Sequence, residues 1–236
     1  MPGNMKRPYV ICHMGSTVNG RIIGERWGKD SRKYGALYEQ CHKKFKSQAW
    51  MVGRVTMEKD FTEGRRARPR KPGRPIPREP FIGDRNASSY AIAVDAHGKL
   101  GWAENSIDGD HVIEILSESV GDGYLQYLRD HGISYIFAGK RDLDFTKALD
   151  QLHHLFGIRT LMLEGGGNIN GSLLHAGLID ELSLLIFPIA DGDAGSPTTF
   201  EVAGELPRKA AQQLSLIEVQ NLKHGVVWLR YKSKRS

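Results

Sequence analysis

A single acid and three glycines separate two apolar runs in the segment LMLEGGGNINGSLLHAG, residues 161–177. Glu164 ends the first run, and Gly165, Gly166 and Gly167 follow it before a short amphipathic stretch. Glycines have no Cβ and let the backbone approach another group closely, and the first N–H groups of a helix attract anions. The spacing therefore predicts an anion site at a strand-to-helix turn, with a carboxylate beside it. A tight turn that needs positive φ angles is the alternative explanation of the glycines.

A second helix start has the same character. The segment GRVT, Gly53 to Thr56, follows the short apolar run AWMVG and adds a cation, Arg54, and a hydroxyl. Neither this segment nor the glycine run is a GxGxxG fingerprint or a P-loop. A helix start with a surface arginine would also explain GRVT. Two anion-suited helix starts in one chain nevertheless favour a ligand with several phosphates, such as a dinucleotide.

Few side chains are placed for acid–base chemistry. Asp60 lies one helical turn after Thr56, where a lone acid is usually solvated, whereas Glu164 closes an apolar strand and is expected to face a cleft. His13, near the end of the first strand, is expected to line the core. The two cysteines and the absence of a zinc-deaminase motif predict no metal site.

The elements that must position these residues alternate between strands and helices. Apolar and β-branched runs predict strands at 9–14, 49–53, 89–95, 111–116, 134–139, 159–165 and 180–189, with a terminal hairpin at 212–220 and 225–232. Periodic segments predict helices at 30–45, 54–61, 121–132, 144–157 and 168–177. This order predicts an α/β fold with a mostly parallel sheet and an antiparallel hairpin at the end. No repeat or linker is evident, so a single domain over 1–236 is expected.

The basic charge of the chain is local. The net charge is +6, and residues 62–80 carry seven basic residues against two acids, or +5 of that total. This Pro/Gly-rich segment is predicted to be a loop, either solvated or in contact with a phosphorylated ligand. No aromatic residues are interleaved with the arginines, so nucleic-acid binding is not expected. No apolar run is long enough to cross a membrane and no signal peptide is recognised, so a cytoplasmic location is expected.

Three motifs together resemble a known family. STVNG, GRVTMEKD and EGGGNINGSLLHAGLIDELSLLIFPIADG, in this order, are similar to the reductase domain of bacterial riboflavin-biosynthesis deaminase/reductases. The resemblance runs from Pro8 to about Lys232. It implies a dihydrofolate-reductase-like three-layer sandwich, and NADPH-dependent reduction of a ribosylaminopyrimidine phosphate of the 5-amino-6-(5-phosphoribosylamino)uracil type. It also implies a homodimer.

The resemblance assigns roles to particular residues. It places Gly53, Arg54 and Thr56 against the cofactor, Gly165, Gly166, Gly167 and Asn168 at its pyrophosphate, Asp60 and Glu164 at the substrate as catalytic residues, and Thr17 and Asn19 at the substrate. Asn19 stands where the family usually has an aspartate. The deaminase half of the bacterial enzymes is absent, which indicates a stand-alone reductase or a diverged relative.

Three alternatives stay open. NADH is possible as cofactor, because Asp95 is expected near the adenosine ribose, where an acid favours a free 2′-hydroxyl, whereas His97 and Lys99 favour NADPH. The substrate of the reductase could be dihydrofolate or another small heterocycle. A non-catalytic module that binds a nucleotide without turnover is the third alternative.

Overall fold

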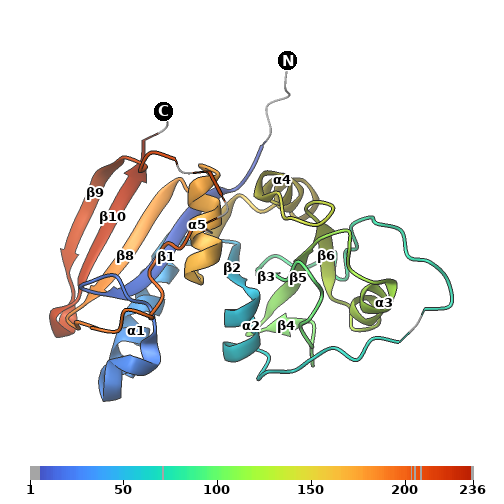
Figure 1. The fold of residues 1–236 in the computed structure, drawn as a ribbon, viewed down its shortest axis with the longest axis horizontal. Helices are drawn as coiled ribbons and strands as arrows, with labels where there is room; N and C mark the ends of the chain where they lie inside the picture. The colour runs from blue at the N-terminus through green and yellow to red at the C-terminus, as the bar shows by residue number, and fades with distance from the viewer. Residues whose placement is uncertain (1–5, 71, 203, 205, 208, 235–236) are drawn as a thin grey trace. The chain divides into compact units, whose positions relative to one another are not determined.

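The computed structural model describes residues 6–70, 72–202, 204, 206–207 and 209–234. Lys71 of the basic segment lies outside the described residues. The chain forms two compact units, one built on residues 48–161 and the other on 9–47 and 162–234 (Figure 1). The strand β7 (Thr160–Leu163) carries the chain from the first unit into the second. The single domain over 1–236 stays a prediction.

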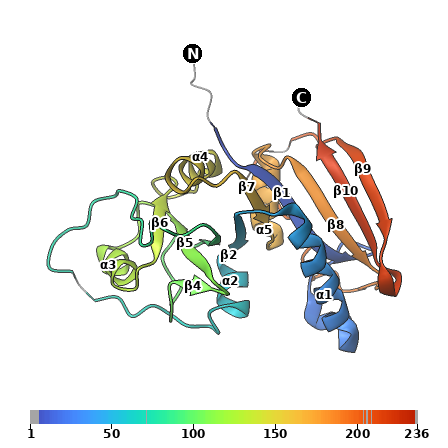
Figure 2. The same ribbon diagram turned by 180° about the vertical axis from the view of Figure 1, so that it is seen from behind.

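The first unit is a parallel sheet with helices. Its elements are β2 (Ala49–Gly53), α2 (Arg54–Asp60), β3 (Tyr90–Val94), β4 (Ser106–Ile107), β5 (Asp110–Leu116), α3 (Asp122–Asp130), β6 (Ser134–Phe137) and α4 (Phe145–Phe156). The strands β2, β3, β5 and β6 pair in that order and run parallel, while the short β4, which the sequence did not predict, pairs antiparallel with β5 (Figure 1 and Figure 2). Because Gly53 pairs with Val94 and Val94 with Ile115, the loops after these three strands leave the same edge.

Local sequence explains the ends of α4. The Asp144 side chain accepts hydrogen bonds from the N–H groups of Thr146 and Lys147, at 2.9 and 3.2 Å, and so caps the helix start. Gly157 ends the helix with φ 67°, a conformation that glycine adopts without strain. The predicted helix and its glycine stop are both confirmed.

One buried acid interrupts the apolar core of this unit. Glu114 on β5 is fully buried and accepts hydrogen bonds from the Trp102 indole and, at 2.7 Å, from the Tyr124 hydroxyl. Burial, together with the nearby Asp95, raises the pKa of Glu114 well above its usual range. The side chain therefore belongs to the core.

The second unit is a four-stranded mixed sheet. Its elements are β1 (Tyr9–Thr17), the 3-10 helix η1 (Gly24–Asp30), α1 (Ser31–His42), the 3-10 helix η2 (Lys43–Phe45), α5 (Gly167–His175), β8 (Glu181–Phe187), β9 (Leu214–Asn221), the 3-10 helix η3 (Lys223–Gly225) and β10 (Val227–Ser233). The strand β1 runs parallel to β8, and β8, β10 and β9 follow in antiparallel order. The predicted central place of β8 and the terminal hairpin are confirmed. Among the helices of the described residues, none has the length and hydropathy to cross a membrane.

Helix α1 packs on one face of this sheet. Its apolar positions Tyr34, Leu37 and Cys41 form a core cluster with side chains of β8 and β10. Within it the rings of Tyr34 and Phe187 stack at 4.7 Å between centroids. The helical spacing of the apolar residues in the sequence thus marks the face that α1 buries.

A strap formed by residues 196–202 crosses α5. The Asn170 side chain donates to the Thr199 carbonyl at 3.0 Å, and the Glu201 N–H donates to the Gly167 carbonyl at 2.9 Å. A Cβ on Gly167 would overlap the Thr198 carbonyl, and a Cβ on Gly171 would overlap the Glu201 carbonyl. These two glycines, one turn apart, are therefore required by the close approach of the strap.

We expect Gly171→Ala to destabilise the protein by about 1–3 kcal/mol, because the added methyl must displace backbone atoms of the strap. Gly35→Ala is the matched control: Gly35 lies on the exposed side of α1, and nothing lies within 4 Å of its added Cβ. It should stabilise by up to ~1 kcal/mol through helix propensity. Urea unfolding measures both, and equal stabilities of the two variants would contradict the tight strap.

Candidate functional site

Glu164 follows β7 directly and contacts a residue that the sequence analysis overlooked. Its Oε1 lies 2.7 Å from Nδ1 of His42, the last residue of α1. The side chains are 13% and 21% exposed, so the pair is largely shielded from water but still reachable. Because an ionised carboxylate only accepts hydrogen bonds, Nδ1 of His42 must carry the proton that points to Glu164.

A second histidine, His13, is wholly buried beside this pair and is structural. The Trp228 indole N–H donates to the Ser183 hydroxyl at 2.8 Å, and this hydroxyl lies 2.8 Å from Nδ1 of His13. Nε2 of His13 lies 3.2 Å from the Tyr38 carbonyl, and the Tyr38 hydroxyl donates to the His13 carbonyl at 2.9 Å. Every donor finds an acceptor if His13 is neutral, with its proton on Nε2. Burial lowers its pKa to about 4, in agreement.

The start of α5 beside Glu164 keeps the character of an anion site. Its N-cap, Gly166, has φ 62°, and no side chain in the described part of the chain caps this helix end. The first N–H groups of α5 therefore lack a side-chain acceptor. Gly167 has a second reason for being glycine, the strap, and the exposed Asn168 begins the outer face of the helix. The predicted pyrophosphate contact of Gly165 to Asn168 stays a prediction.

Thr17 and Asn19 hold the chain after β1 against the chain after β8. The Thr17 hydroxyl donates to Asn19 Oδ1 at 2.8 Å and accepts from the Arg21 N–H at 2.9 Å. Asn19 also accepts from the Asp191 N–H at 3.1 Å and donates its amide to the Asp191 carbonyl at 2.6 Å. An aspartate at 19 could not make the last bond, because a carboxylate oxygen would face a carbonyl oxygen. This loop gives asparagine a structural reason at the position where the family usually has aspartate.

The same loop carries a bidentate ion pair. The Arg26 guanidinium donates to both oxygens of Asp191, at 2.9 and 3.1 Å, and this contact lowers the pKa of Asp191. A shallow hollow lies here, lined by Arg26, Asp191 and residues 189, 190 and 192. The positive charge of Arg26 is therefore already compensated by the carboxylate of Asp191.

In the first unit, α2 begins where the sequence predicts, after Gly53. Arg54 forms an i, i+4 ion pair with Glu58 at 2.5 Å, and Arg66 of the basic segment reaches the other oxygen of Glu58, also at 2.5 Å. Thr56 is half-buried in the first turn, and Asp60 is exposed at the end of the helix. The predicted cofactor roles of Gly53, Arg54 and Thr56, and the predicted substrate and catalytic role of Asp60, stay predictions.

Asp95 is buried in its own turn, and its predicted place near the adenosine ribose stays a prediction. Only 1% of Asp95 is exposed, and its Oδ2 accepts from the N–H groups of Lys99 at 2.5 Å and of Leu100 at 2.8 Å. The carboxylate holds its own turn through Oδ2, whereas its buried Oδ1 has no hydrogen-bond partner among the described residues. His97 and Lys99 are exposed on this turn, and the choice between NADPH and NADH stays a prediction.

Part of the basic segment 62–80 has a structural function. Arg78 donates to the Glu118 and Val120 carbonyls at 3.0 and 2.9 Å, and to the Asp122 carboxylate at 2.6 Å. These contacts fasten the segment to the start of α3. No helix or strand forms in its described residues, as the sequence predicts, and Arg68, Arg70 and Arg74 are exposed.

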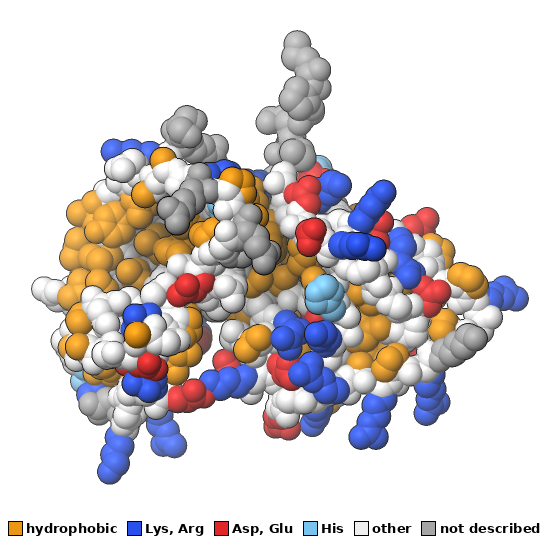
Figure 3. Space-filling view, in the orientation of Figure 1, with side chains coloured by type: hydrophobic (Ala, Val, Ile, Leu, Met, Phe, Trp, Pro, Cys, Tyr) orange, Lys and Arg blue, Asp and Glu red, His pale blue; other side chains and the backbone are white. Residues whose placement is uncertain are grey.

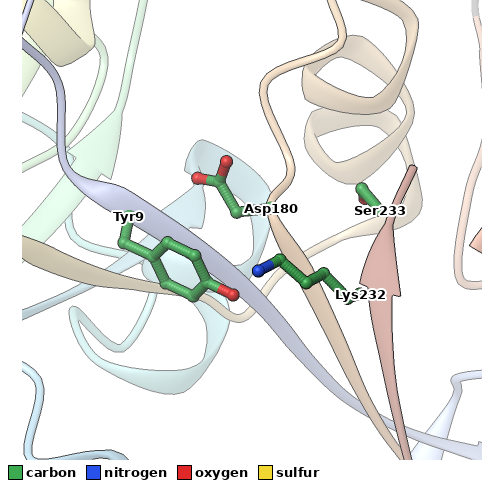
Figure 4. Close-up of a pocket in the computed structure, with 4 residues that line it drawn as sticks. All are labelled: Tyr9, Asp180, Lys232 and Ser233. Atoms are coloured by element: carbon green, nitrogen blue, oxygen red, sulfur yellow. The ribbon is translucent and has the colours of Figure 1, made fainter. Parts of the chain in front are cut away.

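A small pocket lies away from the predicted residues. Tyr9, Asp180, Lys232 and Ser233 line it, at the start of β1 and the end of β10 (Figure 4). Thr17, where the predicted substrate loop begins, is at the opposite end of β1. No group of three or more potential metal ligands occurs among the described residues.

His42 was missed because a single histidine on an amphipathic helix gives little signal. It follows Cys41 and lies four residues after Tyr38, both on the predicted inward face, and that spacing was the available hint. Its partner, Glu164, is 122 residues away in the chain, and only the tertiary fold joins them.

Two proteins named as reductases match most of the chain in sequence. A protein of Aquifex aeolicus is 27% identical over 219 residues, covering 90% of both chains, and one of Methanothermobacter thermautotrophicus is 29% identical over 205 residues, covering 84% of this chain and 86% of the relative. Both are named 2,5-diamino-6-ribosylamino-4(3H)-pyrimidinone 5′-phosphate reductase.

Solved structures and a family model agree with these matches. A pyrimidine reductase-like protein of Corynebacterium diphtheriae superposes with a TM-score of 0.69 at 17% identity, covering 97% of this chain and 93% of its own. The riboflavin biosynthesis reductase of Saccharomyces cerevisiae gives 0.63 at 15% identity, with 99% and 93% covered. These likenesses confirm the predicted dihydrofolate-reductase-like α/β fold. The model of the RibD C-terminal domain matches residues 8–228, and the chain belongs to this family.

Proposed function

We propose that this chain is an NADPH-dependent reductase of 2,5-diamino-6-ribosylamino-4(3H)-pyrimidinone 5′-phosphate. One observation carries the proposal: two relatives with this activity in their names align with 90% and 84% of the chain. Glu164, held beside the uncapped start of α5, lies within that aligned fold and supplies an acceptor for a substrate. The uracil form of the substrate, which the sequence alone suggested, is the second candidate, because the relatives' names specify the 2,5-diamino form.

Each unit has a helix start that suits the phosphates of a dinucleotide. In the second unit, the start of α5 offers N–H groups without a side-chain cap, which suits a pyrophosphate on Gly165 to Asn168. In the first unit, α2 starts at Gly53 without a side-chain cap, and Arg54 and Thr56 lie in its first turn. When bound, NADPH supplies the hydride, and the chain supplies orientation.

The chain's own residues act on the substrate. The ribosylamine opens to an imine whose carbon accepts the hydride and whose nitrogen gains a proton. In the second unit, Glu164 binds or relays protons at the pyrimidine and sugar hydroxyls, and the loop of Thr17 and Asn19 borders the substrate. The substrate role of Asp60, in the first unit, stays a prediction. Proton transfer requires a positioned group within hydrogen-bond reach, and orientation contributes further to the rate.

The assay follows NADPH absorbance at 340 nm with the diaminopyrimidinone, the uracil analogue and dihydrofolate. We expect oxidation with the diaminopyrimidinone, and Glu164→Gln should lower kcat at least ~100-fold while the Kd for NADPH changes less than ~3-fold. Glu104→Gln, at an exposed site of the first unit, is the control. Equal losses in kcat and cofactor affinity would contradict the substrate-side role of Glu164. Binding of NADPH without oxidation in the wild type would favour the non-catalytic module.

The charge of the first unit supports NADPH over NADH. Lys99 and His97 are exposed on the turn after β3. The backbone of Arg66 forms an antiparallel β-bridge with Leu100 at the end of that turn. Asp95 is turned inward, so no carboxylate from this position opposes a 2′-phosphate. An additional phosphate on the ribose is best recognised by such a cationic edge.

We expect kcat/KM to be at least ~10-fold higher with NADPH than with NADH. Lys99→Glu should cost about tenfold with NADPH, or ~1.4 kcal/mol, and little with NADH, because only NADPH carries the 2′-phosphate. Lys147→Glu, exposed on α4, is the matched charge reversal elsewhere. If Lys99→Glu affects both cofactors alike, the edge does not recognise the 2′-phosphate.

The second face of the sheet of the second unit supports a homodimer. Opposite the face that α1 covers, the register aligns Leu184, Leu229 and Val219 in one row across β8, β10 and β9, and Tyr231 pairs with Leu216 in another. Val219 and Leu216 are 53% and 57% exposed. Figure 3 shows hydrophobic side chains gathered over these strands. A contiguous apolar patch of this kind marks an interface, and a twofold copy of the same face would cover it. Within β8, Leu182, Leu185 and Phe187 are buried, so this strand contributes to the patch through Leu184.

Light scattering should give twice the 26.4 kDa of one chain. Val219→Arg should shift the protein to monomer, because it buries a charge in the apolar interface. Leu155→Arg, at a 40% exposed leucine on α4, should remain dimeric. A monomeric wild type would overturn the proposed homodimer.

The cytoplasm, where NADPH and phosphorylated intermediates occur, is the proposed location.

A further inference from the structure

The contact between His42 and Glu164 joins two residues of the second unit that are 122 residues apart in the sequence. One lies at the end of α1 and the other at the carboxyl end of β7, and 2.7 Å separates Nδ1 from Oε1. A carboxylate has two oxygens with about four acceptor sites. The bond to His42 therefore leaves Glu164 with capacity for a substrate N–H or hydroxyl, while it restricts the rotation of the carboxylate.

We propose that His42 is a positioning residue of the reductase: its Nδ1–H holds Oε1 of Glu164 so that the carboxylate meets the substrate in one orientation. The inference rests on the proposed function and adds to it His42, which lies far from the glycine run in the sequence. His42 acts through Glu164 and is not assigned a contact with substrate or cofactor.

The fold holds the His42 backbone firmly enough for this role. One turn earlier, the Tyr38 hydroxyl bonds the His13 carbonyl of β1 at 2.9 Å, and the rings of Tyr38 and His13 lie 4.2 Å apart. Cys41, next to His42, is 1% exposed in the core cluster. Two side chains adjoining His42 are therefore fixed on the sheet, and the position of its ring follows from theirs. A catalytic side chain needs such a rigid support to keep its geometry within about half an ångström.

The other groups around Glu164 do not provide a cation. Burial, and then the charge of Glu164, raise the pKa of Tyr38 well above its usual range, and the same two causes raise that of Cys12. Both side chains therefore stay protonated and neutral near pH 7. His13, with a pKa of about 4, is also neutral. Tyr38 also hydrogen-bonds Glu164, but its hydroxyl is neutral, so His42 is the basic side chain among these four that bonds the carboxylate.

A purely structural contact, which fastens α1 to the turn after β7, is the competing explanation. The two explanations differ in what a substitution does to turnover when the fold is intact. They also differ in the donor geometry that is required, because Nδ2 of an asparagine occupies nearly the place of Nδ1, whereas the amide nitrogen of a glutamine lies farther out.

The experiment measures kcat, both KM values and thermal stability for His42→Ala, His42→Asn and His42→Gln. We expect His42→Ala and His42→Gln to lower kcat by 10- to 100-fold, with the KM for NADPH within ~3-fold of the wild type, since misplacement of a reacting group by 1 Å costs about that much. His42→Asn should restore kcat to within ~5-fold. His154→Ala, at an exposed histidine of α4, is the control.

A double-mutant cycle tests whether His42 acts through Glu164. In the Glu164→Gln background, His42→Ala should lower kcat by less than ~3-fold, because the group that it positions is already gone. Full additivity of the two substitutions would overturn the proposal. So would an unchanged kcat in His42→Ala, or a loss in His42→Asn as large as in His42→Ala.

A readout without turnover separates this inference from the proposed function. In nitrogen-15 spectra of the histidine rings, the signal that disappears in His42→Asn identifies His42. Its Nδ1 resonance should shift in Glu164→Gln, while that of His154 should not. If the wild type reduces none of the substrates but this shift is seen, the proposed function fails and the contact stands. If the shift is absent, the positioning role fails whatever the activity.

Discussion

The arrangement of the second unit depends on one chain of hydrogen bonds through a neutral histidine. The Trp228 indole, the Ser183 hydroxyl, the His13 ring and the Tyr38 backbone join β10, β8, β1 and α1 in sequence. The two bonds of Ser183 are buried and the bond to the Tyr38 carbonyl is partly buried, so breaking one of the buried bonds would leave an unpaired polar group in the core at a cost of about 1–3 kcal/mol. Because this chain fixes α1 against the sheet, it also fixes where His42 meets Glu164. The structural histidine thus determines the place of the functional one.

The glycine run has two physical reasons for its composition. Gly166 takes a positive φ at the helix start, and Gly167 admits the strap that crosses α5. The helix end next to these glycines is without a side-chain cap and suits a phosphate. An argument from close approach alone could not have separated a ligand from the protein's own chain, because both require the same missing Cβ.

Much of the fold could be predicted from the sequence because its signals are local. The alternating strands and helices, the glycine that ends α4, the central β8 and the terminal hairpin all follow from periodicity and turn chemistry. The short β4 and the strap carry no periodic pattern, and they depend on contacts with distant residues. For Asp95 the sequence shows only an acid at the end of a strand, whereas in the structure its Oδ2 accepts from two N–H groups of its own turn. Asn19 likewise acquires its meaning from Asp191, 172 residues away.

The central proposal is that this chain directs hydride to the sugar carbon of a ribosylaminopyrimidine phosphate. The most direct test is a single-turnover reaction with NADPH deuterated at C4 of the nicotinamide, on the transferred face, followed by mass spectrometry and NMR of the product. The account predicts a ribitylamino product with one deuterium on the carbon next to the amine, and almost none with the Glu164→Gln variant. A product without deuterium at that carbon, or no ribitylamino product with any of the pyrimidine phosphates, would contradict it.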